Sequence, residues 1–188
     1  MHGSVIPEAL ERFFIRRMEF DALLRRIRYQ PIPLPEPFER YPCDACGYPT
    51  VEGWNFDYCT ICHWEQDPIQ NLYKGNPDEP NGGPNGPYSL TDARLNFERY
   101  GCMFSPDDHE VFERAQREAA DRQRLLAAYE ALRTARRTED IVAAVGGILA
   151  VERALAAGDE GRKNTRARPS GAMTGPLYCQ IGGTVPGV

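Results

Sequence analysis

Apolar residues near the N-terminus recur mostly at steps of three and four, which is the period of a helix with one buried side. Pro7 and Glu8 suit the first turn of such a helix. We therefore predict an amphipathic helix within residues 5–30, most regular over 7–29. Its apolar positions are Ile6, Leu10, Phe13, Phe14, Met18, Leu24 and Ile27, and its basic positions are Arg12, Arg16, Arg17, Arg25, Arg26 and Arg28. We expect the basic side to face solvent; the alternative is a surface for an acidic partner.

Prolines alternate with other residues at the start of the next segment, residues 31–39, in the run PIPLPEP. Each proline fixes its own φ angle and favours an extended conformation in the residue before it. We predict a stiff, polyproline-like linker, and the alternative is a docking peptide for a partner.

Helix signals return after residues 75–88, a stretch rich in glycine, asparagine and proline that predicts a long irregular loop. Ser89 is a good N-cap, and Asp92 stands at the capping-box position. These residues predict a helix over 90–100, and Gly101 is a typical C-terminal stop.

Two longer helices are predicted within residues 104–157. Ser105, followed by Pro-Asp-Asp, is a strong start signal, and the apolar pattern continues to about residue 136. Thr138 can cap a further helix over 139–157. The two helices could form an antiparallel hairpin.

The helical pattern ends at Gly158, and residues 158–188 are polar, basic and rich in helix breakers, which predicts a mobile tail. No apolar run reaches the roughly 18 residues that a membrane-spanning helix needs. The N-terminus lacks the pattern of a signal peptide. We therefore expect no membrane partner and a cytoplasmic location.

Four of the six cysteines form two close pairs, C-x2-C, separated by twelve residues. A tight turn can present both sulfurs of a pair to one ion, so the two pairs predict a tetrahedral thiolate site within a module of residues 40–103. The ligands would be Cys43, Cys46, Cys59 and Cys62. Zn²⁺ is the expected metal, a single iron is the alternative, and Cys102 and Cys179 have no predicted role.

The residues between the pairs favour a β-hairpin. Gly47 stands where a positive φ angle is often needed, and Glu52-Gly53 suits a turn. Trp54, Phe56 and Tyr58 alternate, so a strand would place their rings on one face, either to cover the metal site or to stack on bases. The expected fold class is α+β: a small zinc-ribbon or β-hairpin module flanked by helices and predominantly helical overall.

Three polar residues adjoin the second cysteine pair. Four thiolates fill a tetrahedral shell, so we expect a packing role for His63; a ligand or acid–base role is the alternative. Glu65 and Asp67 could be paired catalytic carboxylates, but we expect them to bond backbone groups or face solvent. The sequence shows no Ser/His/Asp set and no phosphate-binding glycine loop, so no catalytic residues are predicted.

Three separated motifs resemble the bacterial cysteine-rich CPCC family: YPCDACGY, CTICHWEQDPIQ, and NGGPNG followed by SLTDARLNFERYG. The resemblance covers about residues 40–101. Trp64, Glu65 and Asp67 match a W-E-x-D segment of that family, whereas Asp44 and Ala45 replace its inner proline and cysteine. The resemblance implies a zinc-ribbon-like module without an established enzymatic activity.

Charge bears on the choice of partner. The chain has a net charge of −5, and residues 36–100 carry eleven acidic against four basic residues. A general nucleic-acid binder would usually be basic. We therefore expect a non-enzymatic, zinc-binding protein–protein interaction module, one version being a bacterial immunity protein that neutralises a basic cognate toxin. The alternatives are a nucleic-acid-associated zinc ribbon and, less favoured, a thiol redox enzyme.

Overall fold

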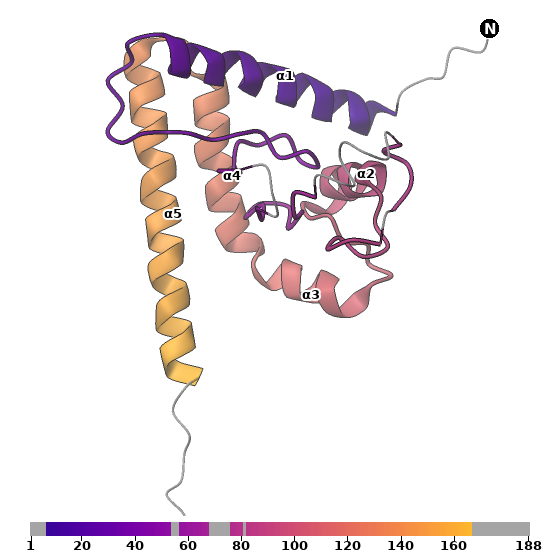
Figure 1. Ribbon diagram of the computed structural model, residues 1–188. Helices are drawn as coiled ribbons and strands as arrows, with labels where there is room; N and C mark the ends of the chain where they lie inside the picture. The colour runs from indigo at the N-terminus through magenta and orange to yellow at the C-terminus, as the bar shows by residue number, and fades with distance from the viewer. Residues whose placement is uncertain (1–6, 54–56, 68–75, 81, 167–188) are drawn as a thin grey trace, which may run out of the picture.

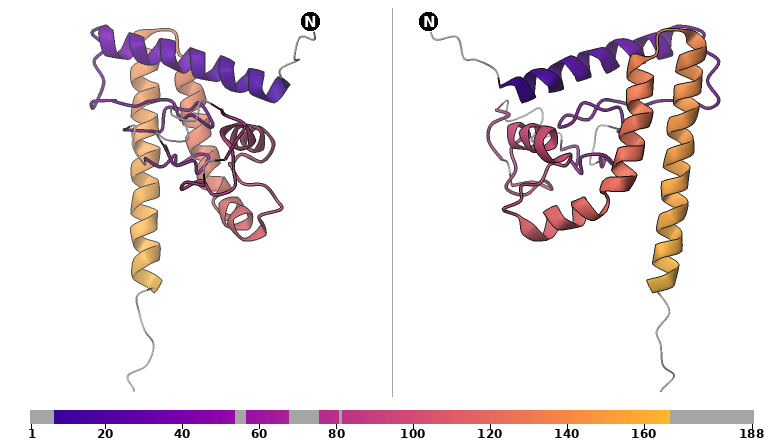
Figure 2. Two further views of the ribbon diagram at one scale, coloured as in Figure 1. Left: turned by 45° about the vertical axis from the view of Figure 1, so that its right-hand side comes forward. Right: turned by 180° about the vertical axis from the view of Figure 1, so that it is seen from behind.

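The computed structural model describes residues 7–53, 57–67, 76–80 and 82–166. Its helices in chain order are α1 (Glu8–Tyr29), α2 (Leu90–Tyr100), α3 (His109–Arg117), α4 (Ala119–Thr134) and α5 (Thr138–Arg166). Helices α4 and α5 lie side by side, and α1 crosses over one end of the pair (Figure 1). The cysteine loops lie beneath α1, between α4 and α2, as the two further views also show (Figure 2).

The predicted α+β fold class is wrong, because the described residues form helices and contain no strand. The extended backbone pairs only at two isolated antiparallel bridges, Tyr41 with Val51 and Tyr58 with Glu65. Each bridge closes within one cysteine turn, so the described residues on either side of 54–56 form no ladder with each other. The Asp57 carboxylate also accepts hydrogen bonds from the backbone N–H groups of Glu52 and Gly53, which occupies these two donors with a side chain.

Helix α2 has the predicted bounds and cap. The Ser89 side chain accepts from the Asp92 N–H, and the Asp92 side chain accepts from the Ser89 N–H. Gly101 ends the helix at a φ of 74°. These contacts satisfy backbone groups that a helix end would leave unpaired, so local sequence sets where this element begins and ends.

The single helix predicted from residue 105 to about 136 is broken into α3 and α4 at Glu118. The Arg122 side chain explains the break. Its guanidinium donates to the Ala115 carbonyl oxygen at 2.6 Å, and the Glu118 N–H bonds to that oxygen at 3.2 Å in a tighter turn. The carbonyl is then satisfied without a continuous helix, and the chain changes direction.

Helix α5 continues past the predicted end at Ala157 to Arg166, so the expected tail is helical over residues 158–166. The rest of the tail lies outside the described residues. None of the described helices is both long enough and apolar enough to cross a bilayer.

The core forms where α4, α5, α1 and the cysteine loops meet. Helix α4 contributes Leu125, Tyr129 and Leu132, and the facing side of α5 contributes Ile141, Val145 and Ile148. Helix α1 adds Phe13, Phe20 and Leu24. The proline linker then crosses α5, where Arg40 reaches Glu152 at 2.9 Å. The cysteine loops are therefore enclosed by helices from both ends of the chain.

Candidate metal centre

The first cysteine turn is closed by two backbone hydrogen bonds. The Gly47 N–H donates to the Cys43 carbonyl, and the Cys43 N–H donates to the Tyr48 carbonyl, both at 2.9 Å. Gly47 has a φ of 78°, as its position after the pair predicted. A Cβ there would lie only 3.5 Å from Arg17 and Phe13 of α1, so this turn packs closely on the helix.

The second turn repeats the pattern of the first. The His63 N–H donates to the Cys59 carbonyl, and the Cys59 N–H donates to the Trp64 carbonyl, again at 2.9 Å. His63 has a φ of 72° and so occupies the position equivalent to Gly47, directly after the second cysteine of its pair. A non-glycine residue is uncommon in this conformation, so the turn imposes it on the histidine.

The two turns bring four sulfur atoms together. The Sγ atoms of Cys43, Cys46, Cys59 and Cys62 all lie within 4.8 Å of one another, and all four residues are fully buried. Cys43 and Cys62 are 3.6 Å apart at sulfur, as are Cys46 and Cys59. These separations exclude disulfides and are close to the roughly 3.8 Å expected around a tetrahedral ion with 2.3 Å bonds to sulfur. The cluster can hold a metal ion.

Burial makes ionisation of the cysteine sulfurs unfavourable unless a cation lies among them. It raises the pKa of the Cys46 and Cys62 thiols well above the usual value. Burial opposes ionisation of Cys59 too, but hydrogen bonds from the neighbouring thiols outweigh it and lower the pKa of Cys59. Thiolates are the ligand form, so ionising all four sulfurs in this setting requires a cation among them.

Hydrogen-bond donors and arginines near the cysteine turns would help to offset the negative charge of four thiolates. The Thr50 hydroxyl donates to the Cys59 sulfur at 2.9 Å. Arg16 Nε donates to the Cys46 carbonyl at 2.7 Å, and Arg94 Nε donates to the Asp44 carbonyl at 3.0 Å. Burial lowers the pKa of Arg94 to about 10. Sequence reasoning missed Thr50, Arg16 and Arg94 as parts of this centre, because nothing local to the cysteine motifs marks them.

The basic side of α1 is only in part the solvated face that the sequence predicted: Arg25 and Arg28 are exposed, but the arginines nearer the start of the helix form ion pairs. Arg17 pairs with Asp44 at 2.6 Å, and Arg16 and Arg12 both pair with Glu98 of α2. The helix uses these arginines to bind the acidic cysteine module of its own chain.

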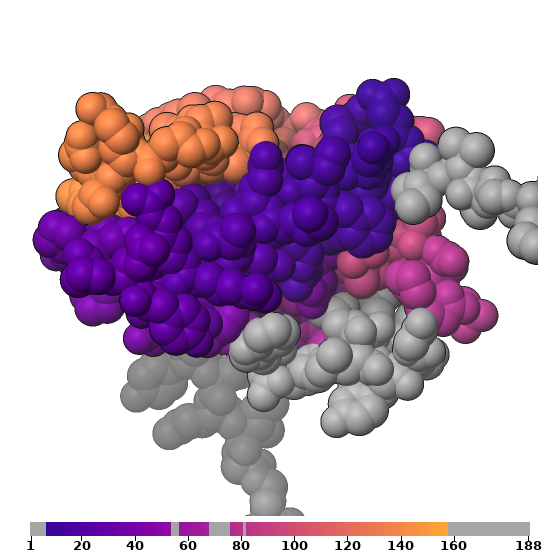
Figure 3. Space-filling model, turned by 90° about the horizontal axis from the view of Figure 1, so that it is seen from above, coloured from indigo at the N-terminus to yellow at the C-terminus, as the bar shows by residue number. Residues whose placement is uncertain are grey.

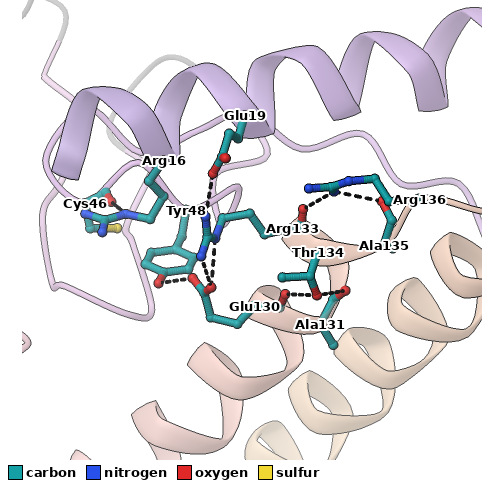
Figure 4. Close-up of polar contacts among 10 residues, drawn as sticks. All are labelled: Arg16, Glu19, Cys46, Tyr48, Glu130, Ala131, Arg133, Thr134, Ala135 and Arg136. Atoms are coloured by element: carbon teal, nitrogen blue, oxygen red, sulfur yellow. Dashed lines mark hydrogen bonds and ion pairs between the residues drawn. The ribbon is translucent and has the colours of Figure 1, made fainter. Parts of the chain in front are cut away.

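Figure 4 shows how α1, the first cysteine turn and α4 are joined by polar contacts. The Tyr48 hydroxyl donates to Glu130 of α4 at 2.6 Å. Arg133 of α4 binds both Glu130 and Glu19 of α1. The Arg16 guanidinium lies over the Tyr48 ring, 4.9 Å from its centroid. Tyr48, two positions after Cys46, thus connects the metal centre to α1 and α4.

His63 has partners other than the sulfurs. Its Nδ1 atom contacts the Tyr58 hydroxyl, and its Nε2 atom lies 3.4 Å from Arg122 and 3.6 Å from Glu118. Both ring nitrogens face these groups, which supports the packing role expected for His63. Burial lowers its pKa.

The remaining predicted residues near the second pair are spread out. Trp64 is fully buried in the core, and Asp67 is also buried. The Glu65 backbone N–H and carbonyl bond the Asn85 side chain, each at 2.9 Å, so the asparagine of the NGGPNG motif joins its loop to the second turn. Of the expected aromatic face, Trp54 and Phe56 lie outside the described residues, and Tyr58 is 47% exposed.

The cysteines outside the pairs do not join the cluster where the structure describes them. Cys102 is buried, and its sulfur lies 3.8 Å from the Phe104 carbonyl oxygen and from Gln116 Nε2. Cys179 lies outside the described residues.

The family model described as cysteine-rich CPCC matches residues 41–118. The match confirms the predicted resemblance and extends it from the expected limit at residue 101 to the end of α3. Neither the curated proteins nor the solved structures gave a match. The metal centre, the α2 segment and α3 thus form the part of this chain that is similar to the family.

Proposed function

We propose that the four cysteines hold one zinc ion as a closed structural centre, and that the chain acts as a non-enzymatic protein-binding module. The observation that carries the proposal is the complete burial of four sulfurs within 4.8 Å of one another. Four thiolates fill a tetrahedral zinc shell and leave no coordination position for a reacting water. The ion then serves to hold the two turns against each other.

The position of the centre supports a structural role. The first turn contacts α1 through Arg16 and Arg17, and it contacts α4 through Tyr48. The second turn is tied to the segment after α2, because the Met103 N–H donates to the Cys62 carbonyl at 2.8 Å. A metal at this point would hold together two turns that contact α1, α4 and the segment after α2.

The same contacts weigh against the two alternative functions. A thiol redox enzyme needs an accessible nucleophilic sulfur, and the cluster cysteines are fully buried. A nucleic-acid ribbon would offer arginines to phosphates, but Arg12, Arg16 and Arg17 already form ion pairs within the chain.

Protein binding is supported by an acidic surface around the start of α2 and the segment before α3. The loop before α2 is fastened to it, because the Thr91 hydroxyl donates to Asp78. The Tyr88 hydroxyl accepts from the Ser105 N–H at 3.0 Å, which brings the next loop alongside. The exposed carboxylates of this acidic surface are Asp78, Glu79, Asp92 and Asp107. A basic protein is the partner that such a surface would attract, and one version is a toxin that the chain neutralises as a bacterial immunity protein.

The partner is tested by native mass spectrometry of the full chain isolated from its source cell. We expect a complex with a basic protein that weakens with salt and with Glu79→Lys combined with Asp107→Lys. Glu139→Lys, an exposed charge reversal on α5, is the matched control and should have no effect. Recovery of the chain without a basic partner contradicts the protein-binding proposal. For the immunity version, the isolated partner must be toxic and the chain must suppress that toxicity; a non-toxic partner contradicts this version alone.

A further inference from the structure

Helix α1 presents an outward stripe of residues that no contact within the described chain explains. Its members follow one another at steps of four and three residues, and all are exposed: Glu11, Ile15, Met18, Ala22, Arg25 and Tyr29. We call this set the outer stripe of α1. It lies opposite the buried residues Phe13, Phe20 and Leu24. The alternation of four and three is the spacing of a seam between two packed helices.

The centre of the outer stripe is apolar. Ile15 is 48% exposed and Met18 is 69% exposed, with Phe14 beside them at 44%. Seen from above, α1 runs across the middle of the upper face of the molecule (Figure 3). Single exposed apolar residues are ordinary, but a contiguous group at helix-packing spacing marks an interaction surface.

The charges of the stripe identify the partner. Glu11 precedes Met18 by seven residues and Arg25 follows it by seven, so opposite charges lie at equal distances of about 10 Å on either side. Among the described residues, neither charge has an ion-pair partner within the chain. Ala22 and Phe14 are likewise each four residues from Met18, which sets a small residue and a large one at matching distances.

From this symmetry we propose that α1 pairs with α1 of a second copy of this chain, antiparallel, with the two helices crossing at Met18. This arrangement places Glu11 against Arg25 of the partner subunit and Phe14 against Ala22 of the partner subunit. A parallel pair would instead oppose like charges, Glu11 to Glu11 and Arg25 to Arg25. The surface is isologous, so the assembly closes as a dimer.

Helix α1 is well prepared for this role. Arg16 and Arg17 fasten its inner side to the first cysteine turn, and Arg133 fastens Glu19 to α4. A surface held rigid before association loses less conformational entropy when it binds. The dimer surface is also separate from the acidic surface near α2 and α3, so either proposal can fail without the other.

Sedimentation velocity of the zinc-loaded full chain over a dilution series tests the dimer. We expect a concentration-dependent shift from 21.2 kDa to twice that mass. Met18→Asp should abolish the shift while far-UV circular dichroism and zinc content stay unchanged. Ala127→Asp, on the exposed side of α4, is the matched control and should leave the shift unchanged.

Charge exchange distinguishes the antiparallel pair from other arrangements. Glu11→Arg and Arg25→Glu should each weaken the dimer by roughly tenfold, because each change turns both Glu11–Arg25 contacts between the subunits into like-charge contacts. The double variant with both changes should return to the wild-type dissociation constant, and Glu79→Arg should have no effect. A monomer at all concentrations, a dimer that tolerates Met18→Asp, or a double variant no tighter than the single ones overturns the proposal.

Discussion

Arg16 Nε donates a hydrogen bond to the Cys46 carbonyl oxygen at 2.7 Å, which joins α1 directly to the first cysteine turn. The other side of the same guanidinium binds Glu98 of α2 and lies over the Tyr48 ring. One side chain therefore connects two helices to the metal centre, although the three segments are far apart in the sequence.

Replacing Arg16 should destabilise the whole assembly. Arg16→Ala removes a part-buried, charge-assisted hydrogen bond and leaves Glu98 with weaker compensation, so we expect a loss of about 2–3 kcal/mol in the free energy of unfolding. Urea unfolding of the zinc-loaded protein measures this loss. Arg124→Ala, which removes an exposed arginine paired with Asp121 at 3.7 Å, is the control and should cost under about 1 kcal/mol. Equal effects from the two variants would contradict the role assigned to Arg16.

Gly47 should not tolerate a side chain. Its φ of 78° is a left-handed conformation that costs an L-residue roughly 1–2 kcal/mol. Gly47→Ala should lower the free energy of unfolding by about that amount, as measured by urea unfolding. Gly53→Ala is the matched control, because no atom lies within 4 Å of the added Cβ and the backbone there is not left-handed. A neutral Gly47→Ala variant would show that the turn relaxes.

Loss of one ligand should affect the chain unevenly. Cys62→Ser removes a ligand from the second turn, so we expect amides within residues 41–67 to lose protection from hydrogen exchange. The α4–α5 hairpin has its own apolar interface, formed by Leu132, Ile141 and Val145 among others, and its amides should keep most of their protection. Cys102→Ser changes a buried cysteine outside the cluster and should spare the protection of residues 41–67. Uniform loss across the chain, or no loss in the cysteine turns, would disprove this division.

Acid should weaken the link between the cysteine turn and α4. Burial alone would raise the pKa of Glu130, but hydrogen bonds from Arg133 and Tyr48 outweigh it and lower that pKa below 4.5. A carboxyl group whose pKa is lowered by folding stabilises the folded protein at pH values above its unfolded-state pKa. This contribution is lost as the pH falls through the folded-state pKa.

Glu130→Gln should therefore be less stable than wild type at neutral pH, and the difference should shrink below about pH 4.5. Thermal unfolding of both zinc-loaded proteins across this range measures the difference directly. Because Glu130 bonds Tyr48 of the first cysteine turn, loss of zinc would also remove this contact, so zinc content is measured at each pH and only zinc-loaded samples are compared. A difference that stays constant with pH would contradict the assigned ionisation.

Local sequence rules predicted part of this structure well. Ser89 and Asp92 form the expected capping box, Gly47 has the expected positive φ, and the two cysteine pairs converge. These features depend on residues a few positions apart. The hairpin prediction failed where the Asp57 side chain binds the backbone N–H groups of Glu52 and Gly53. The prediction of one long helix failed because the Arg122 side chain binds the Ala115 carbonyl. Both are side-chain contacts that periodicity does not report.

The arginines of α1 illustrate a second limit. A helical pattern shows which residues share a face, but it does not show what that face contacts. Arg16 and Arg17 looked like members of a solvated side, and their acceptors Cys46 and Asp44 lie about thirty residues away in the chain. Only the tertiary arrangement shows that the acidic module is the partner of Arg16 and Arg17.

We propose that Cys43, Cys46, Cys59 and Cys62 together hold one structural zinc ion. Native mass spectrometry of the full chain, with elemental analysis of the same sample, measures the metal content of the chain and of its cysteine variants. We predict one zinc per chain, its loss in Cys43→Ser and Cys62→Ser, its retention in Cys102→Ser, and loss of the folded cysteine turns when a chelator removes the ion. A chain that binds no metal, holds iron in place of zinc, or keeps zinc after Cys62→Ser would contradict the claim.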